Sequence, residues 1–384
     1  MTDYDAIVLG LGGMGSAAAA QLADRGARVL GVEQYGPAHD LGSSHGETRI
    51  VRQAYFEHPD YVPLLRRAYV HWERLAAARG APLFVRTGAL MIGAEDSAVV
   101  SGTLESARRW DLPHEVLDQA AMAKRYPQFA LRTGECGVYE DNAGYVNPEQ
   151  AVQTQLDLAT RAGAELWFDT VVDGWSLDGD VVSVRAGGQS VTAARLVLTA
   201  GAWTSKLVTA GLLPLRAVRR LMFFLDPPDG LADFEPDRFP VYVFETGTGD
   251  ALYGFPHIGA PDAGVKIGFH YRGPDVDPDV IDRAVSEAEK AEMQAAVRER
   301  IPGLDGPVVD ARVCMYTMTP DEDFILGWLS GAERRVAVAA GFSGHGFKFT
   351  PVVGEVLADL ALDGRTDQPI DFLSPARFDL RGSG

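Results

Sequence analysis

The chain has 384 residues, of which 46% are hydrophobic and 23% are charged, so it can bury the cores of two domains. Its 35 basic and 53 acidic residues give a net charge of -18, which repels phosphate backbones and anionic lipid, and we expect neither a nucleic-acid partner nor a membrane partner. The two cysteines, Cys136 and Cys314, stand outside any CxxC pattern, which argues against a disulfide framework and a cysteine-based zinc site.

The N-terminal residues lack the basic region of a secretory signal peptide, because Asp3 and Asp5 precede the first apolar run. No later stretch reaches the roughly eighteen uninterrupted apolar residues that a membrane span requires. These two features predict a cytoplasmic protein.

The first 33 residues have the pattern of a βαβ unit. Aliphatic residues at 4–9 predict a strand, and a glycine-rich turn then leads into an alanine-rich helix that ends near Arg25. Residues 28–32 predict a second strand, which ends at Glu33. This unit is typical of a nucleotide-binding domain.

Helices are also expected further along the chain. Asp60 is placed to cap one that Gly80 ends, and Asn147 and Pro148 have the residue types of an N-cap and a first helical position. Two later helices have comparable signals at their starts. These signals are a capping box at Ser286 and Glu289 and an N-cap at Thr350 followed by Pro351.

Strands are predicted between these helices by alternating or β-branched runs. Three runs in the middle of the chain read as strands that return to the nucleotide-binding domain, and four later runs form a β-rich block. The runs are 165–172, 181–185 and 191–200, followed by 218–224, 241–245, 251–255 and 264–271.

The glycine-rich turn GLGGMG matches G-x-G-x-x-G through Gly10, Gly12 and Gly15. It follows a strand and opens a helix whose amides can bind a pyrophosphate, and Glu33 lies 18 residues after Gly15, where a carboxylate reaches a ribose hydroxyl. A purely structural turn is the alternative. NAD and FAD share this pattern, but no second copy is present for NAD(P)H, which favours a flavin that the organic substrate reduces directly.

The order of segments predicts an α/β (α+β, two-domain) fold in which a Rossmann-like FAD-binding domain is interleaved with a β-rich substrate domain with flanking helices. The FAD-binding domain is expected to be discontinuous. It takes residues 1–80, 147–217 and 311–384, and the substrate and catalytic domain takes residues 81–146 and 218–310.

Five stretches together resemble one family: SSHGETRIVR (43–52), TAGAW (199–203), KIGFHY (266–271), VCMYT (313–317) and FSGHGFKF (342–349). The chain is similar along nearly its whole length to the monomeric sarcosine oxidase and N-methyltryptophan oxidase family of amine-oxidising flavoproteins. The resemblance implies FAD attached covalently through Cys314, an amino-acid substrate, O2 as the electron acceptor and a monomeric protein.

The resemblance also implies roles for single residues. Arg52 and Lys348 would bind the substrate carboxylate, Tyr253 and His270 would line the substrate cavity, and Lys266 would be the cation that promotes oxygen reduction. Arg49 and His45 would lie beside the flavin ring. The residues expected at the cofactor are Gly10, Gly12, Gly13, Met14, Gly15, Glu33, Gln34, Ser43, Thr48, Arg49, Val172, Gly201, Trp203, Cys314, Gly344, His345, Gly346, Phe347 and Lys348.

Local patterns are compatible with these roles. In the expected strand 264–271, alternation puts Lys266 and His270 on one face. Arg49 and Arg52 would share a helical face if their segment is helical. The glycines around Gly344, before a helix start, would aim amides at the negative charge of a reduced flavin.

The function expected from these features is oxidation of a secondary amine amino acid: a hydride passes to FAD, the imine is hydrolysed and O2 becomes H2O2. Sarcosine, another N-methyl amino acid, a cyclic imino acid and a glycated (fructosyl) amino acid all remain open as substrates. An FAD-dependent dehydrogenase with another acceptor is the alternative enzyme, and a flavin-binding sensor is the alternative outside enzymes.

Overall fold

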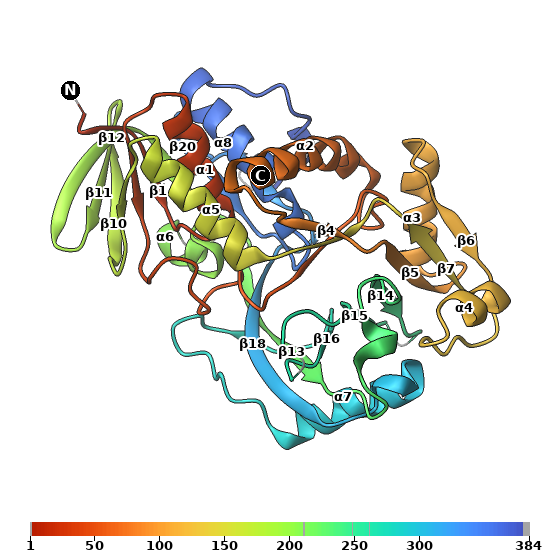
Figure 1. Cartoon of the computed structure of the whole chain (residues 1–384). Coiled ribbons are helices and arrows are strands. Elements are labelled where there is room, and N and C mark those ends of the chain that lie inside the picture. The colour runs from red at the N-terminus through yellow and green to blue at the C-terminus, as the bar shows by residue number, and fades with distance from the viewer. Residues whose placement is uncertain (1, 210–211, 248, 261, 379–384) are drawn as a thin grey trace, which may run out of the picture.

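The computed structural model describes residues 2–209, 212–247, 249–260 and 262–378. These residues form three β-sheets with helices packed around them (Figure 1). The α-helices are α1 (Gly13–Asp24), α2 (Val62–Arg79), α3 (Ala98–Arg109), α4 (Gln119–Arg125), α5 (Pro148–Arg161), α6 (Thr204–Leu207), α7 (Glu287–Arg300) and α8 (Thr350–Asp363). None of the helices in these ranges is long and apolar enough to pass through a bilayer.

The first sheet has a parallel core, in which β9, β2, β1, β12 and β20 are successive neighbours. An antiparallel hairpin, β10 and β11, extends it through β12, and β19 pairs with β20. This arrangement confirms the predicted Rossmann-like α/β unit and the return of the middle strands to it. The strands are β1 (Tyr4–Leu9), β2 (Val29–Val32), β9 (Glu165–Trp167), β10 (Val172–Asp178), β11 (Val181–Ala186), β12 (Gln189–Leu198), β19 (Ile325–Trp328) and β20 (Val336–Ala340).

Strand β1 shows how the sequence builds this unit. Its side chains alternate, so that Ala6 and Val8 join the core under α1, α5 and α8, while Ile7 and Leu9 join the core on the opposite face. Small residues let α1 and α8 approach closely, because a Cβ on Gly354 would lie 2.6 Å from the backbone of Ala17. The N-termini of these two helices consequently meet above the end of β1.

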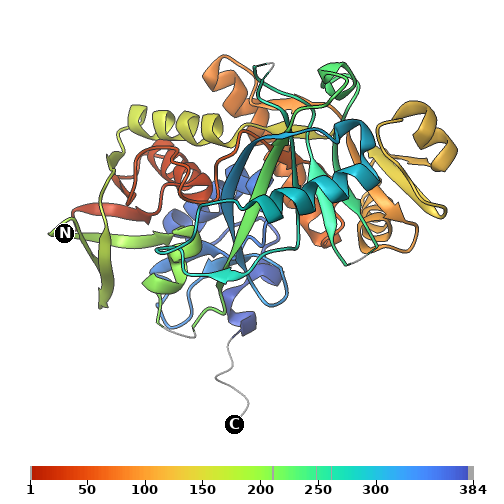
Figure 2. The same ribbon diagram turned by 90° about the horizontal axis from the view of Figure 1, so that it is seen from below.

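The second sheet is β-rich, as expected, and α7 lies across it (Figure 2). Met293 and Val297 of α7 pack into the same core as Phe223 and Leu225. The strands are β5 (Ala89–Ala94), β6 (Glu115–Leu117), β7 (Glu135–Glu140), β13 (Arg216–Leu225), β14 (Val241–Glu245), β15 (Ala251–Gly254), β16 (Val265–Phe269), β17 (Asp275–Val276) and β18 (Val308–Met318).

A third, small sheet joins β3 (Arg49–Val51), β8 (Gly144–Val146) and β4 (Phe84–Arg86). The longest pairing in the molecule is between β13 and β18, which run antiparallel from the second sheet toward the first (Figure 1). Beyond β18 the chain enters β19 and β20 of the first sheet. The β13–β18 ribbon therefore carries Cys314 into the region between the two large sheets.

Two local expectations were wrong, and the condition set on the segment of Arg49 and Arg52 is not met. Asp60 is not a cap, because it lies inside a short 3-10 helix (Pro59–Tyr61) whose N-cap is His58. Thr350 is the first residue of α8 instead of its cap, since a 3-10 turn over 347–349 already precedes it. The segment with Arg49 and Arg52 is not helical, because β3 pairs with β8.

The other helix signals are confirmed. The side chain of Asn147 accepts a hydrogen bond from the amide of Gln150, and Gly80 ends α2 in the left-handed conformation. Ser286 and Glu289 form both hydrogen bonds of a capping box. The sequence predicts these signals correctly because each depends on residues only a few positions apart.

Candidate active site

A cavity of about 370 Å³ lies where the glycine-rich turn leaves β1. Gly10 has φ +87°, and a Cβ there would lie 2.8 Å from the backbone of Ala200. A Cβ on Gly15 would lie 1.8 Å from the carbonyl oxygen of Gly10, so neither position accepts another residue without a shift. Residues 10–14 of the turn line the cavity at the N-terminus of α1, where backbone amides favour an anion.

Glu33 ends β2 and is buried beside this turn. Its carboxylate accepts hydrogen bonds from the amide of Leu11 at 2.8 Å and from the amide of Tyr35 at 3.1 Å, and Nε2 of His39 lies 3.3 Å away. A carboxylate has about four acceptor positions, so it can still accept a bond from a hydroxyl group in the cavity. Glu33 thus lies where the sequence analysis expected an acid, and it lines the cavity.

The predicted cofactor residues divide between this cavity and a second one, except Gly15, which lines neither. Sequence reasoning missed several residues that line the larger cavity; Ser44 is one, and its Oγ accepts the amide of Gly13 at 3.1 Å. Asp173 and Asp279 are others, and neither stands in a recognisable motif. The predicted residues that line the larger cavity are Gly10, Gly12, Gly13, Met14, Glu33, Gln34, Ser43, Arg49, Val172, Gly201, Trp203, Gly344, Gly346 and Phe347.

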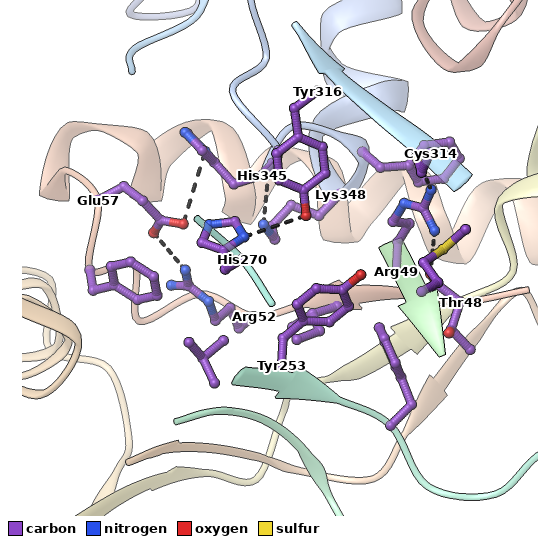
Figure 3. Close-up of a pocket in the computed structure, with 17 residues that line it drawn as sticks. Thr48, Arg49, Arg52, Glu57, Tyr253, His270, Cys314, Tyr316, His345 and Lys348 are labelled. Carbon is purple, nitrogen blue, oxygen red and sulfur yellow. Dashed lines mark hydrogen bonds and ion pairs between the residues drawn. The ribbon is translucent and has the colours of Figure 1, made fainter. Parts of the chain in front are cut away.

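The second cavity is small, about 70 Å³, and adjoins the first. Arg49, Tyr316, Gly344 and Phe347 line both, so the two cavities meet at these side chains. The small cavity brings together residues that the sequence analysis singled out from distant segments (Figure 3). They are Thr48, Arg49, Arg52, Tyr253, His270, Cys314, Gly344, His345, Phe347 and Lys348.

Glu57 is the main polar residue of the small cavity that sequence reasoning missed. Its Oε2 lies 2.5 Å from Nη2 of Arg52, whose guanidinium also stacks over Tyr55 and Phe56 at 4.5 and 4.3 Å. Burial acts to raise the pKa of Glu57, but the charges of Arg52, His345 and Lys348 outweigh it and lower the pKa to about 2. The carboxylate is therefore ionised and neutralises Arg52.

Lys348 supplies a second cation to the same cavity. It is buried, and its Nζ donates to the carbonyl oxygen of His345 at 2.7 Å and lies 4.9 Å from the ring centre of Tyr55. Burial, with a contribution from Arg52 and against the opposing charge of Glu57, lowers the pKa of Lys348 to about 7. Two cations thus face one carboxylate in a space of low dielectric constant.

Three histidines are held neutral at pH 7; His45 and His345 are buried, and His270 is half-buried. Burial is the main cause in each, and it lowers the pKa of His45 and His270 to about 3 and that of His345 to about 4. His270 has the hydroxyl of Tyr316 at 3.4 Å from its Nδ1, and His345 contacts the hydroxyl of Tyr55. Nε2 of His45 is buried without a hydrogen-bond partner. Neutral imidazoles can accept hydrogen bonds from an amine, which imidazolium ions cannot.

Cys314 lines the small cavity next to Arg49, which lines both cavities. Its Sγ is 3.9 Å from Nη2 of Arg49 and 4.0 Å from the carbonyl oxygen of Ser43, and it packs with Met222 and Phe224. The other cysteine, Cys136, is buried in the second sheet and lines neither cavity.

Lys266 projects from β16 toward the turn at 46–48. Its Nζ donates to the carbonyl oxygens of Gly46 at 2.5 Å and of Thr48 at 3.0 Å and to Oγ1 of Thr48 at 3.1 Å, so three oxygens accept all the protons of an ammonium ion. Burial, with the charge of Arg49, lowers its pKa well below the usual value. Lys266 lies behind Thr48 and outside the lining of both cavities, unlike His270.

Residues 5–360 match the protein family described as FAD dependent oxidoreductase. The chain belongs to this family. FAD fits the larger cavity of this oxidoreductase, since residues 10–14 of the glycine-rich turn line it, the N-terminus of α1 faces the space and Glu33 offers free acceptor positions.

Similar proteins cover almost the whole chain of this FAD-dependent oxidoreductase. Monomeric sarcosine oxidase from Streptomyces avermitilis is 46% identical over 375 residues, which is 98% of both chains. N-methyl-L-tryptophan oxidase from Salmonella heidelberg is 36% identical over 377 residues, again 98% of both. The structure of NikD, an unusual amino acid oxidase essential for nikkomycin biosynthesis, superposes with a TM-score of 0.83 at 25% identity and 97% coverage of each chain. The resemblance drawn from the five stretches is confirmed.

Proposed function

We propose that this enzyme oxidises a small secondary amine amino acid, of the N-methyl or cyclic kind, with O2 as the electron acceptor. The observation that carries the proposal is the pair of buried cations, Arg52 and Lys348, in a small cavity that meets the FAD cavity at Arg49, Tyr316, Gly344 and Phe347. The similar proteins named for sarcosine and N-methyl-L-tryptophan support the class of substrate.

Binding of the substrate carboxylate follows from the charges. A free carboxylate can replace Glu57 as the partner of Arg52 and can accept a bond from Lys348 on its other side. This clamp fixes one end of the substrate, and the neutral imidazole of His270 can form a hydrogen bond with its amine. Bound FAD supplies the redox chemistry: it accepts a hydride from the carbon next to nitrogen and returns two electrons to O2, which gives H2O2.

The size of the cavity favours small side chains on the substrate. About 70 Å³ is enclosed, and Ile50, Phe56, Val243 and Phe255 form the apolar part of its wall. A substrate of the size of sarcosine needs little more space than this once Glu57 has moved away. An aromatic N-methyl amino acid would require displacement of the wall.

We also propose that FAD is bonded through its 8α-methyl group to Cys314, whose residue lines the small cavity and whose sulfur lies 3.9 Å from Nη2 of Arg49, a residue that lines both cavities. The intact chain from flavin-replete cells should then carry the mass of one FAD after denaturation. Cys314→Ser should give the bare chain mass, and Cys136→Ser should retain the flavin. A bare mass for the unmodified protein would contradict the covalent bond.

The remaining assignments are proposals of the same kind. Lys266 is the cation that assists O2 reduction, and Gly344 to Phe347, ahead of α8, aim backbone amides at the flavin edge. The FAD-binding part comprises residues 1–80, 147–217 and 311–384, and the substrate part comprises residues 81–146 and 218–310. The protein acts as a monomer in the cytoplasm.

The activity is tested with a panel of N-methylated, cyclic and glycated amino acids, with O2 consumption and H2O2 release as measurements. The expected result is bleaching of the flavin without O2 and peroxide production in air, strongest for sarcosine-sized substrates. Bleaching with little peroxide would instead identify a dehydrogenase. Absence of bleaching with the whole panel would overturn the proposed function and leave a flavin-binding sensor.

A further inference from the structure

Arg220 is a buried arginine that the proposed reaction does not use. It lies in β13 with 4% of its surface exposed, and its Nη1 donates to the carbonyl oxygen of Arg272 at 2.6 Å. Among residues 2–209, 212–247, 249–260 and 262–378, no carboxylate forms an ion pair with it, and its Nε has no hydrogen-bond partner. Burying a cation without a counter-ion costs free energy, so its presence calls for a physical reason.

The guanidinium covers the ring of Tyr316, with Cζ 4.8 Å from the ring centre. The register of β13 and β18 places Arg220 directly opposite Cys314, so the two side chains share a face of the ribbon with Tyr316, two residues further on. Tyr316 lines both cavities, while Arg220 lines neither. The guanidinium of Arg220 therefore packs against the ring of Tyr316 from outside the cavities.

Arg220 also holds the segment that carries His270. The carbonyl that it binds belongs to Arg272, two residues after His270, and the hydroxyl of Tyr316 lies 3.4 Å from Nδ1 of that histidine (Figure 3). The chain then turns at Gly273, where φ is +136° and a Cβ would lie 1.9 Å from the carbonyl oxygen of Arg219 and 3.0 Å from Nη1 of Arg220. One guanidinium thus contacts both sides of the Tyr316–His270 pair.

A cation over the face of a phenol ring is attracted to the ring electrons and makes the hydroxyl a stronger hydrogen-bond donor. Because burial lowers the pKa of His270 to about 3, its neutral ring can accept this bond at Nδ1 and must then carry its proton on Nε2. We propose that Arg220 is a positioning residue that sets, through Tyr316, the orientation and tautomer of His270 in the substrate cavity. Its effect on rate rests on the proposed amine oxidation, but its effect on His270 does not.

The test uses the FAD-loaded protein labelled with ¹⁵N in its 8 histidines. His270→Gln identifies the His270 signals in the NMR spectrum, which should show a proton on Nε2 alone. Arg220→Gln should convert them to a mixture of tautomers, and Arg220→Lys should restore part of the original signal. Arg219→Gln is the matched control, because this neighbouring arginine is also buried but pairs with Glu289 at 2.6 Å on the other face.

A second measurement is the limiting rate of flavin reduction by substrate without O2. We expect Arg220→Gln to lower it by about tenfold, and by less than about twofold when Tyr316 is already phenylalanine. An unchanged His270 spectrum in Arg220→Gln, or an equal change in Arg219→Gln, would overturn the proposal. If Arg220→Gln does not fold, Tyr316→Phe takes its place in the test and should itself change the His270 signals. An unchanged His270 spectrum in Tyr316→Phe would then overturn the proposal. A protein that no amine reduces would refute only the proposed function.

Discussion

Arg52 and Glu57 are joined by an ion pair of 2.5 Å in the small cavity, and Lys348 and His345 lie beside it. The arginine that would bind a substrate carboxylate thus already has a carboxylate partner from its own chain. Binding of substrate is an exchange of one anion for another. The affinity of the site depends on how strongly Glu57 competes.

Removal of that competition should strengthen binding of small carboxylates. In Glu57→Gln we expect the Kd for acetate, measured from the flavin absorption spectrum, to fall about tenfold, which is ~1.4 kcal/mol. The variant should also be less stable, since Arg52 and Lys348 then lack their buried counter-ion. Glu47→Gln, which removes the partner of Arg312 at 2.9 Å, serves as the control. Weaker acetate binding in Glu57→Gln would show that Glu57 helps the anion and does not compete with it.

The charge of Lys348 should make anion binding depend on pH. Its pKa of about 7 means that it is protonated below pH 7 and neutral above, so the Kd for acetate should rise as the pH increases through that value. Acetate itself stays ionised over this range, so the change in Kd reports the titration of Lys348. Lys348→Met should bind weakly and without this dependence, whereas Lys206→Met, at an exposed lysine, should retain it. A flat profile in the unmodified protein would contradict this prediction.

The proposed role of Lys266 separates the two halves of the reaction. In Lys266→Met, substrate should still reduce the flavin, while reoxidation by O2, followed by stopped-flow absorbance, should slow by about a hundredfold or more. Lys290→Met, at a lysine on α7 paired with Glu287, should alter neither half-reaction. Equal slowing of both halves would mean that Lys266 mainly holds the turn at Gly46 and Thr48 in place.

The glycine-rich turn offers a test of cofactor binding. Gly15→Ala places a Cβ 1.8 Å from a carbonyl oxygen, and this clash should displace the turn and abolish FAD binding. In Gly36→Ala the new Cβ meets nothing within 4 Å, and FAD content, measured as the ratio of flavin to protein absorbance, should be unchanged. Normal FAD content in Gly15→Ala would show that the turn tolerates a shift.

Much of the fold could be predicted from the sequence. The βαβ unit, the caps at Asn147 and Ser286 and the β-rich block follow from residues close together in the chain, and the structure has them where they were expected. The errors at Asp60 and Thr350 have one cause. Each helix is preceded by a 3-10 turn, so the capping group differs from the one that residue type alone indicates.

The sequence by itself determined the family, the glycine turn with its acid at Glu33 and the set of polar residues around Arg52 and Lys348, because motifs record local geometry and residue type. Only the tertiary structure decided that Glu57 forms an ion pair with Arg52, that three histidines are neutral and that Arg220 packs over the ring of Tyr316. The physical reason is that charge and hydrogen-bond energies depend on distance and burial. Both are fixed when segments far apart in the chain, such as β3, β13 and β18, pack together.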